Sequence, residues 1–266
     1  MPLSSTFTTT TALLPPPNQP RLILPTRTIP SPSANHRVLN DALAVRLEVF
    51  VDEQKCAAEF EIDEDDARSW HWVVYDTAAR NPGVPDSGSD SGSGAGAGAG
   101  SATPTLKIPV GVVRLVPPPH ASHEGFVAAY APDAAGTETG RDITKDGYDL
   151  EHEPYIKFGR VAVLAAYRGA GVAGRLMLEA MEWAGRNPGE ITRAFRAIYE
   201  REGGLKEVAS GDNDIPAWKG LALVHAQVDV ERFYQRLGFV TDEGLGRWIE
   251  EGIEHVGMWK RLDIVD

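Results

Sequence analysis

Residues 161–176 read VAVLAAYRGAGVAGRL, the most informative stretch of the sequence. A run of apolar, β-branched residues predicts a strand, and a run with helical spacing follows, so the glycines lie in a strand-to-helix turn. Free N–H groups at a helix N-terminus bind anions, and Gly169, Gly171 and Gly174 let a phosphate approach the backbone closely. Because Arg168 adds positive charge, the stretch predicts a phosphate-binding turn. The alternative is a tight turn without a ligand.

The same three glycines match the G-x-G-x-x-G pattern of dinucleotide-binding proteins. That pattern also requires an acidic residue about 20 positions further on, at the end of the next strand. Residues 187–192 instead read NPGEIT, a helix breaker followed by a polar segment. A nicotinamide-dependent oxidoreductase therefore stays open only as a weak alternative. A nucleoside-triphosphate loop is excluded, because no Gly-Lys-Ser/Thr follows the glycines.

Strand and helix patterns alternate on both sides of the turn. They predict strands at 21–24, 70–75, 108–116, 155–163, 221–224 and 255–262, and helices at 39–50, 172–183 and 229–237. Ser33 or Asn35 is expected to cap the first helix, and Asn187-Pro188 to end the second. This order predicts an α/β (α+β) fold built around one sheet.

Domain boundaries follow from composition. Residues 1–19 are rich in Thr and Pro and predict a disordered tail, and residues 20–266 predict one domain. A low-complexity insert at 79–105 has nothing large to bury, so we expect a flexible loop. Because strand patterns flank it, it reads as an enlarged hairpin loop rather than a domain linker. A second loop insert is predicted at 117–150.

Composition excludes several classes of protein. The net charge is −12, with 26 Lys plus Arg against 38 Asp plus Glu, which argues against a nucleic-acid groove. The single cysteine, Cys56, excludes an internal disulfide framework and a multi-cysteine metal site, and it fits a reducing compartment. The sequence has no 18-residue apolar run for a membrane-spanning helix and no secretory or transit signal. We therefore expect a cytoplasmic protein with no nucleic-acid or membrane partner; its oligomeric state stays open.

Residues 168–173 have the form R-x-x-G-x-A, which resembles the Q/R-x-x-G-x-G/A loop of the GCN5-related N-acetyltransferase family. Residues 231–239, ERFYQRLGF, look like a later helix of that family. Residues 45–56, VRLEVFVDEQKC, and 251–258, EGIEHVGM, are similar to its ElaA-type branch. The resemblance covers most of residues 20–262 outside the inserts.

The resemblance implies a mixed sheet flanked by helices, the acyl-CoA N-acyltransferase fold. It implies acetyl-CoA as co-substrate, no metal, and a small-molecule or protein amine as acceptor. Backbone N–H groups of the strand at Val161, Ala162 and Val163 would hold the acetyl carbonyl. The pyrophosphate would contact the loop residues Arg168, Gly169, Ala170, Gly171, Val172, Ala173 and Gly174.

Two catalytic residues are expected. By resemblance, Tyr234 would protonate the departing thiolate; the alternative is a core aromatic that packs beside Phe233. Relatives often carry an acid on the central strand, where this chain has Lys157 and Arg160. Glu153, at the start of that strand with Glu151 and His152, is the candidate base, acting through water. A solvated charge is the alternative for each of the three.

Other polar residues have two interpretations. Six acids lie at Glu59, Glu61, Asp63, Glu64, Asp65 and Asp66. They could attract a cationic amine, or they could form a solvated acidic loop. Cys56 is interpreted as a structural thiol rather than a nucleophile. His71, His225 and His255 lie on apolar strands without metal-ligand spacing, so they are interpreted as core or rim residues.

The sequence therefore predicts an N-acetyltransferase that transfers an acetyl group directly from acetyl-CoA to an amine. The alternative is a catalytically inactive acyl-CoA-binding module acting as a sensor or scaffold, which the missing acid on the central strand favours. No motif covers the surface that would select the acceptor.

Overall fold

The computed structural model describes residues 7–18, 21–77, 107–121, 125, 153–201 and 215–265. Its strands are β1 (Thr9–Leu14), β2 (Trp70–Asp76), β3 (Ile108–Val116), β4 (Ile156–Val163), β5 (Leu221–Gln227), β6 (Val240–Thr241), β7 (Arg247–Glu250) and β8 (Ile253–Arg261). Its longer helices are α1 (Arg37–Arg46), which continues as a π-helix (Leu47–Glu53), α4 (Val172–Arg186), α5 (Pro188–Arg201) and α7 (Glu231–Arg236). Single 3₁₀ turns lie at Ala58–Phe60, Asp66–Arg68, Ala165–Tyr167, Val228–Val230 and Glu243–Leu245.

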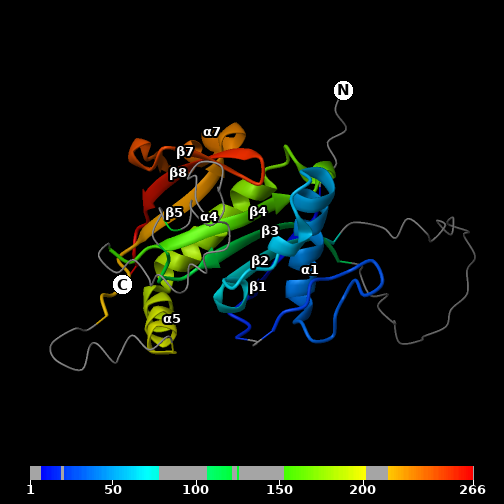
Figure 1. Cartoon of the computed structure of the whole chain (residues 1–266), viewed down its shortest axis with the longest axis horizontal. Helices are drawn as coiled ribbons and strands as arrows, with labels where there is room; N and C mark the ends of the chain where they lie inside the picture. Colours follow the sequence, from blue (N-terminus) through cyan, green and yellow to red (C-terminus); the bar gives the residue numbers. More distant parts are fainter. Residues whose placement is uncertain are drawn as a thin grey trace, which may run out of the picture.

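These strands form one eight-stranded sheet in the order β1-β2-β3-β4-β5-β8-β6, with β7 also paired to β8 (Figure 1). β4 and β5 run parallel, and the other neighbouring strands run antiparallel. The sheet is therefore mixed. The predicted fold class, one mixed sheet flanked by helices, is confirmed.

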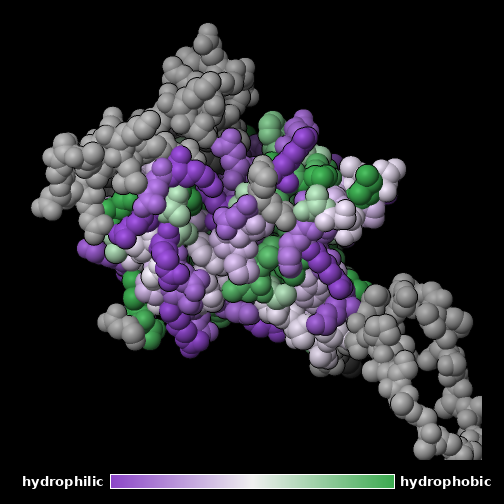
Figure 2. Space-filling model, turned by 90° about the horizontal axis from the view of Figure 1, so that it is seen from below, coloured by the Kyte–Doolittle hydropathy of each residue, from purple (hydrophilic) through white to green (hydrophobic). Residues whose placement is uncertain are grey.

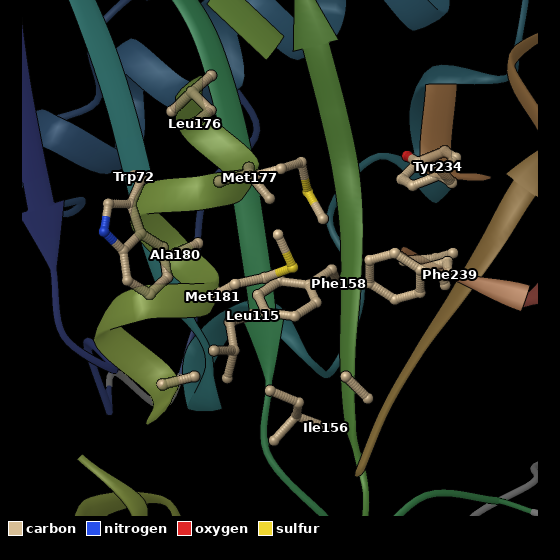
Figure 3. Close-up of a cluster of buried hydrophobic side chains, with 14 of the residues drawn as sticks. Trp72, Leu115, Ile156, Phe158, Leu176, Met177, Ala180, Met181, Tyr234 and Phe239 are labelled. Atoms are coloured by element: carbon tan, nitrogen blue, oxygen red, sulfur yellow. The ribbon is translucent and has the colours of Figure 1, made fainter. Parts of the chain in front are cut away.

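Helices α1 and α4 cover opposite faces of this sheet. Side chains alternate between the two faces along a strand, so each strand supplies both layers of the core. One layer joins α1 to Val73, Val112 and Ala162. The other joins α4 to a larger group that includes Trp72, Leu115 and other residues drawn in Figure 3. Each candidate functional residue can be located by the face of the sheet on which it lies.

Two expectations about the N-terminal region were wrong. Residues Thr9–Leu14, expected in a disordered tail, form edge strand β1, which pairs with β2 from Thr9–Asp76 to Leu14–His71. The Thr11 hydroxyl also donates to Glu179 of α4 at 3.0 Å, which links the strand to the helix layer. Residues 21–24 form no strand; the Ile23 N–H donates to the Asn35 side chain at 2.9 Å.

Helix boundaries also differ from expectation. His36, not Ser33 or Asn35, caps α1, because its ring nitrogen accepts from the Val38 N–H at 3.2 Å. Asn187-Pro188 ends α4 as expected, but Pro188 also starts α5. Proline is favoured at a first helical position, where its missing N–H has no intrahelical acceptor to lose.

The predicted insert at 79–105, and residues 122–124 and 126–150 of the second insert, lie outside the described residues. Within the described part of the chain, no helix has the length and apolar character needed to cross a membrane. On the face shown in Figure 2, hydrophilic and apolar groups are mixed in small patches. Such mixing is ordinary for a protein surface and marks no large apolar docking site on that face.

Candidate active site

Strands β4 and β5 are paired over three residues and then separate. Their parallel pairing covers only Ile156–Ala222, Lys157–Leu223 and Phe158–Val224. Beyond Phe158, β4 keeps its β3 neighbour but has no β5 partner. Since backbone N–H and C=O groups alternate between the two edges of a strand, part of the backbone of residues 159–163 faces an opening. Val161, Ala162 and Val163, the predicted acyl-binding residues, lie there.

A bulge in β4 marks the start of this opening. Arg160 has a φ of 51°, in the left-handed region, and the β3–β4 register shifts between Val112 and Arg114. A bulge bends a strand and changes the direction of its following backbone groups. The Arg160 guanidinium lies 3.2 Å from an Asp63 carboxylate oxygen, which holds the bulged residue in place.

The glycine-rich turn lies at the end of β4, next to the open strand edge. Gly169 and Gly171 have φ values of 75° and 79°, which non-glycine residues adopt only with strain. A Cβ placed at Gly169, Gly171 or Gly174 would meet no atom within 4 Å, so the space above these glycines is open. Gly171 precedes α4, whose first N–H groups lack intrahelical acceptors. The geometry fits an anion, as the sequence predicts.

Arg168, predicted to contact the pyrophosphate, has a partner in the structure. Its guanidinium donates to both carboxylate oxygens of Glu53 at 2.6 and 2.7 Å, and its Nε donates to the Val163 carbonyl at 2.9 Å. The hydrogen bonds from Arg168 lower the pKa of Glu53, which therefore stays charged. Glu53 ends the π-helix that follows α1, and no sequence pattern singled it out as a residue at the turn.

Tyr234 of α7 lies between the diverging strands, with its hydroxyl on the side that faces β4 (Figure 3). Its ring packs against Phe233 and Phe239 at centroid distances of 5.0 and 6.0 Å, on the α4 side of the sheet. Burial raises the pKa of the phenol, so it stays protonated. The ring is therefore a buried core aromatic, and the role of its hydroxyl as an acid stays a prediction.

Glu153 is not positioned for the predicted role of base. It precedes β4, at the end opposite the opening, and accepts two hydrogen bonds from Arg261 at 2.5 and 2.8 Å. Those hydrogen bonds lower its pKa, which makes it a weaker proton acceptor. The sequence pattern placed Glu153 at the start of the correct strand, whereas in the structure it precedes β4, and the pattern could not show at which end of β4 the neighbouring strand separates.

The acidic segment is not a fully solvated loop, because arginines of the same chain neutralise much of it. Arg46 of α1, which is fully buried, binds Glu61 at 2.6 Å and Asp66 at 2.7 Å. Arg114 of β3 binds Asp63 at 2.5 and 2.9 Å. Burial alone would raise the pKa of Asp66, but Arg46 and Arg114 hold it well below its usual value. The network therefore joins α1, residues 61–66 and β3.

Lys157 and Cys56 are two further polar candidates. Burial lowers the pKa of Lys157 to about 8, so its ammonium loses a proton more readily than that of an exposed lysine. Burial raises the pKa of the Cys56 thiol, which disfavours the nucleophilic thiolate. In the described residues, no three His, Cys, Asp or Glu side chains are grouped as metal ligands.

No protein-family model matches the chain. Solved structures similar to it include a Lactobacillus plantarum protein to which N-acetyltransferase activity is ascribed, with 20% identity and a TM-score of 0.46, covering 96% of this chain and 98% of that one. Escherichia coli ElaA has 19% identity and a TM-score of 0.44, covering 96% and 100%. Arabidopsis thaliana NAA60 in complex with acetyl-CoA has 12% identity and a TM-score of 0.42, covering 96% and 98%.

These neighbours are of the kind that the sequence resemblance names, and ElaA is among them. Identities of 20% or less with TM-scores below 0.5 are too low to assign an activity. The functional assignment therefore rests on the residues and geometry of this chain.

Proposed function

We propose that the chain is an acetyl-CoA-dependent N-acyltransferase that moves an acetyl group directly to an amine. One observation carries the proposal: β4 and β5 separate after three paired residues, and the glycine-rich turn lies at the end of β4 where they have separated. A long thioester with a phosphorylated end matches that combination of an open strand edge and free helix N–H groups. The sequence motif at residues 168–173 supports the same ligand.

In this proposal, the N–H groups from Gly169 to Gly174 bind the pyrophosphate of acetyl-CoA. The Arg168 guanidinium supplies positive charge once it leaves Glu53, or once it binds Glu53 and the pyrophosphate together. Backbone groups at Val161, Ala162 and Val163 hold the acyl arm and its carbonyl. A preorganised N–H group directed at the developing oxyanion stabilises the transition state, which is often the largest catalytic contribution.

Proton transfer needs an acid and a base. The buried Tyr234 phenol, protonated and directed into the opening, would donate its proton to the departing thiolate. At neutrality the pH is about 3.4 units below the pKa of an alkylammonium acceptor, so forming the neutral amine costs about 4.6 kcal/mol. Glu153 is too poorly placed to supply the base.

The alternative function is an acyl-CoA-binding module without catalysis. The absence of an acid in the middle of β4, where Lys157 and Arg160 stand, favours it. A nicotinamide-binding protein is the third candidate and depends on the bare glycine pattern. The three make different predictions about ligands and turnover.

The test measures thermal unfolding of the full chain with acetyl-CoA or with NADH, followed by an acceptor screen. A ligand at 100 times its Kd adds about 2.7 kcal/mol of stability, or a few degrees. We expect stabilisation by acetyl-CoA but not NADH, and acetylation of at least one amine in a panel of amino acids, polyamines, amino-sugar phosphates and lysine peptides. Stabilisation without acetylation would favour the binding module, and stabilisation by NADH alone would overturn the proposal.

A further inference from the structure

His225 occupies the point where β4 and β5 separate. It directly follows Val224, the last β5 residue that pairs with β4. Val224 and Ala226 point into the core on the α4 side, so alternation places the His225 side chain on the opposite face. Tyr234 belongs to the α4 side. The imidazole and the phenol therefore lie on opposite faces of the sheet, close in the chain to the point where β4 and β5 separate.

Neighbouring contacts fix the face on which His225 lies. Two residues further along β5, Gln227 bonds Gln54, at the end of the π-helix after α1, at 3.0 Å. The ring of Trp248 from β7 meets the His225 ring edge-on, with centroids 4.9 Å apart. His225 is half-buried, so solvent or a ligand still reaches it.

Several polar groups near the opening make contacts within the fold. The Arg160 guanidinium is held by Asp63, and the Glu251 carboxylate accepts from the Ala57 N–H at 3.0 Å. Glu153 lies at the far end of β4. An imidazole gains and loses a proton readily near neutral pH, which is the property that a general base needs.

We propose that His225 is the general base that takes the proton from the acceptor ammonium, directly or through one water, an inference that rests on the proposed N-acyltransferase function. The neutral amine nitrogen then forms a bond to the thioester carbonyl carbon, and the carbon–sulfur bond breaks. Tyr234 gives its proton to the leaving thiolate and regains one from the former amine nitrogen. His225 releases the first proton to solvent, so each turnover yields amide, free thiol and one proton.

The position of His225 can be tested without knowing the acceptor. Bromoacetyl-CoA places an alkylating carbon where the acetyl group would sit, and a nearby imidazole nitrogen displaces bromide from it. We expect peptide mass mapping to find the label on His225 in a Cys56→Ser background, with protection by acetyl-CoA. His255, on neighbouring strand β8 and stacked on the same Trp248, is the internal control and should stay unlabelled. Label on His255 but not His225 would overturn the assignment.

The catalytic role is tested with His225→Gln and the matched control His255→Gln, using the best acceptor from the amine panel. We expect His225→Gln to lower kcat/KM about 10²-fold or more, the usual size of general-base catalysis, while acetyl-CoA affinity by calorimetry stays unchanged. The loss should shrink for a hydrazide, whose nitrogen is already neutral at the assay pH. Equal activity of both variants would refute the role of His225 alone, whereas failure of the wild-type chain to bind acetyl-CoA would refute the proposed function together with it.

Discussion

At the scale of single residues, the hydroxyl of Tyr234 distinguishes a catalytic acid from an aromatic side chain that only packs in the core. Tyr234→Phe keeps the ring contacts with Phe233 and Phe239 but removes the hydroxyl. We expect kcat to fall about 10²-fold with little change in melting temperature, because the lost group acts only on the leaving thiolate. Tyr167→Phe, which removes a hydroxyl bonded to Asp76 at 3.0 Å, is the control in steady-state kinetics. A Tyr234→Phe enzyme with full kcat would reduce Tyr234 to a packing residue.

Glu53 competes with phosphate for Arg168. Their bidentate pair is about half exposed, and such pairs contribute about 0.2–1 kcal/mol. Replacing Glu53 with Ala frees the guanidinium, so we expect calorimetry to show up to about fivefold tighter acetyl-CoA binding. Glu48→Ala, at an exposed position of the same π-helix, should leave the affinity unchanged. Weaker binding in Glu53→Ala would mean that Glu53 positions Arg168 for the ligand instead of withholding it.

At the scale of elements, a substitution in the first turn of α4 should raise the stability of the fold and weaken ligand binding. Gly174 lies within the helix, and its added Cβ would meet no atom of the chain. Gly174→Ala should therefore stabilise the fold by about 0.5–1 kcal/mol. Cβ atoms tilt toward the helix N-terminus, so the new methyl group would enter the space proposed for the pyrophosphate and weaken acetyl-CoA binding.

The matched control for that helix is Gly189→Ala near the start of α5, where a Cβ also meets nothing. Both variants should raise the melting temperature, and only Gly174→Ala should raise the Kd for acetyl-CoA. If both bind acetyl-CoA as tightly as the wild type, the turn does not hold its phosphates.

The elements also show which parts of the fold local sequence patterns can predict. Spacing predicts α4 and the glycine turn because both are local: apolar residues recur at helical intervals and glycines occupy the φ-positive positions. It misses β1, because threonines beside prolines look like a tail until the edge of β2 and Glu179 give them partners. It also misses α5, although Ile191, Phe195 and Ile198 are spaced for a helix, because the proline before them also signals a stop.

Long-range contacts explain why the candidate site was only partly predictable. Local sequence supplies the turn residues and Tyr234, but the three-residue pairing of β4 with β5 joins residues more than 60 positions apart in the chain. That pairing decides that Glu153 is at the wrong end and that His225 is at the opening. No local pattern around either residue contains this information.

At the scale of the whole molecule, buried charges tie distant segments together. Asp66 is fully buried between Arg46 and Arg114. Asp66→Asn would leave these arginines with an uncompensated buried charge, which typically costs about 3–5 kcal/mol. We expect a large drop in the urea midpoint of unfolding. Glu182→Gln, which breaks an exposed pair with Arg186, should cost no more than about 0.5 kcal/mol. Similar midpoints for the two variants would show that the network adds little to stability.

The same buried region makes stability depend on pH through His71. Burial lowers the pKa of His71 to about 4, and its Nε2 lies 3.0 Å from the Asp66 carbonyl, so the folded protein holds a neutral ring. In the unfolded chain a histidine has a pKa of about 6.5, so between these values the unfolded state binds a proton that the folded state does not. Stability therefore falls as pH drops from about 6.5 to 4, by about 3 kcal/mol for His71. His120, whose pKa burial also lowers, acts in the same direction.

Carboxylates such as Asp66 behave differently, because their lowered folded pKa confines their loss of stability to pH values near and below the unfolded value of about 3.9. The interval from pH 6.5 to 5 therefore reports mainly on histidines. Urea unfolding at several pH values in this interval should show a steeper loss of stability for the wild type than for His71→Gln, because glutamine does not titrate. Parallel pH profiles for the two proteins would show that His71 takes up its proton in the folded state as easily as in the unfolded chain.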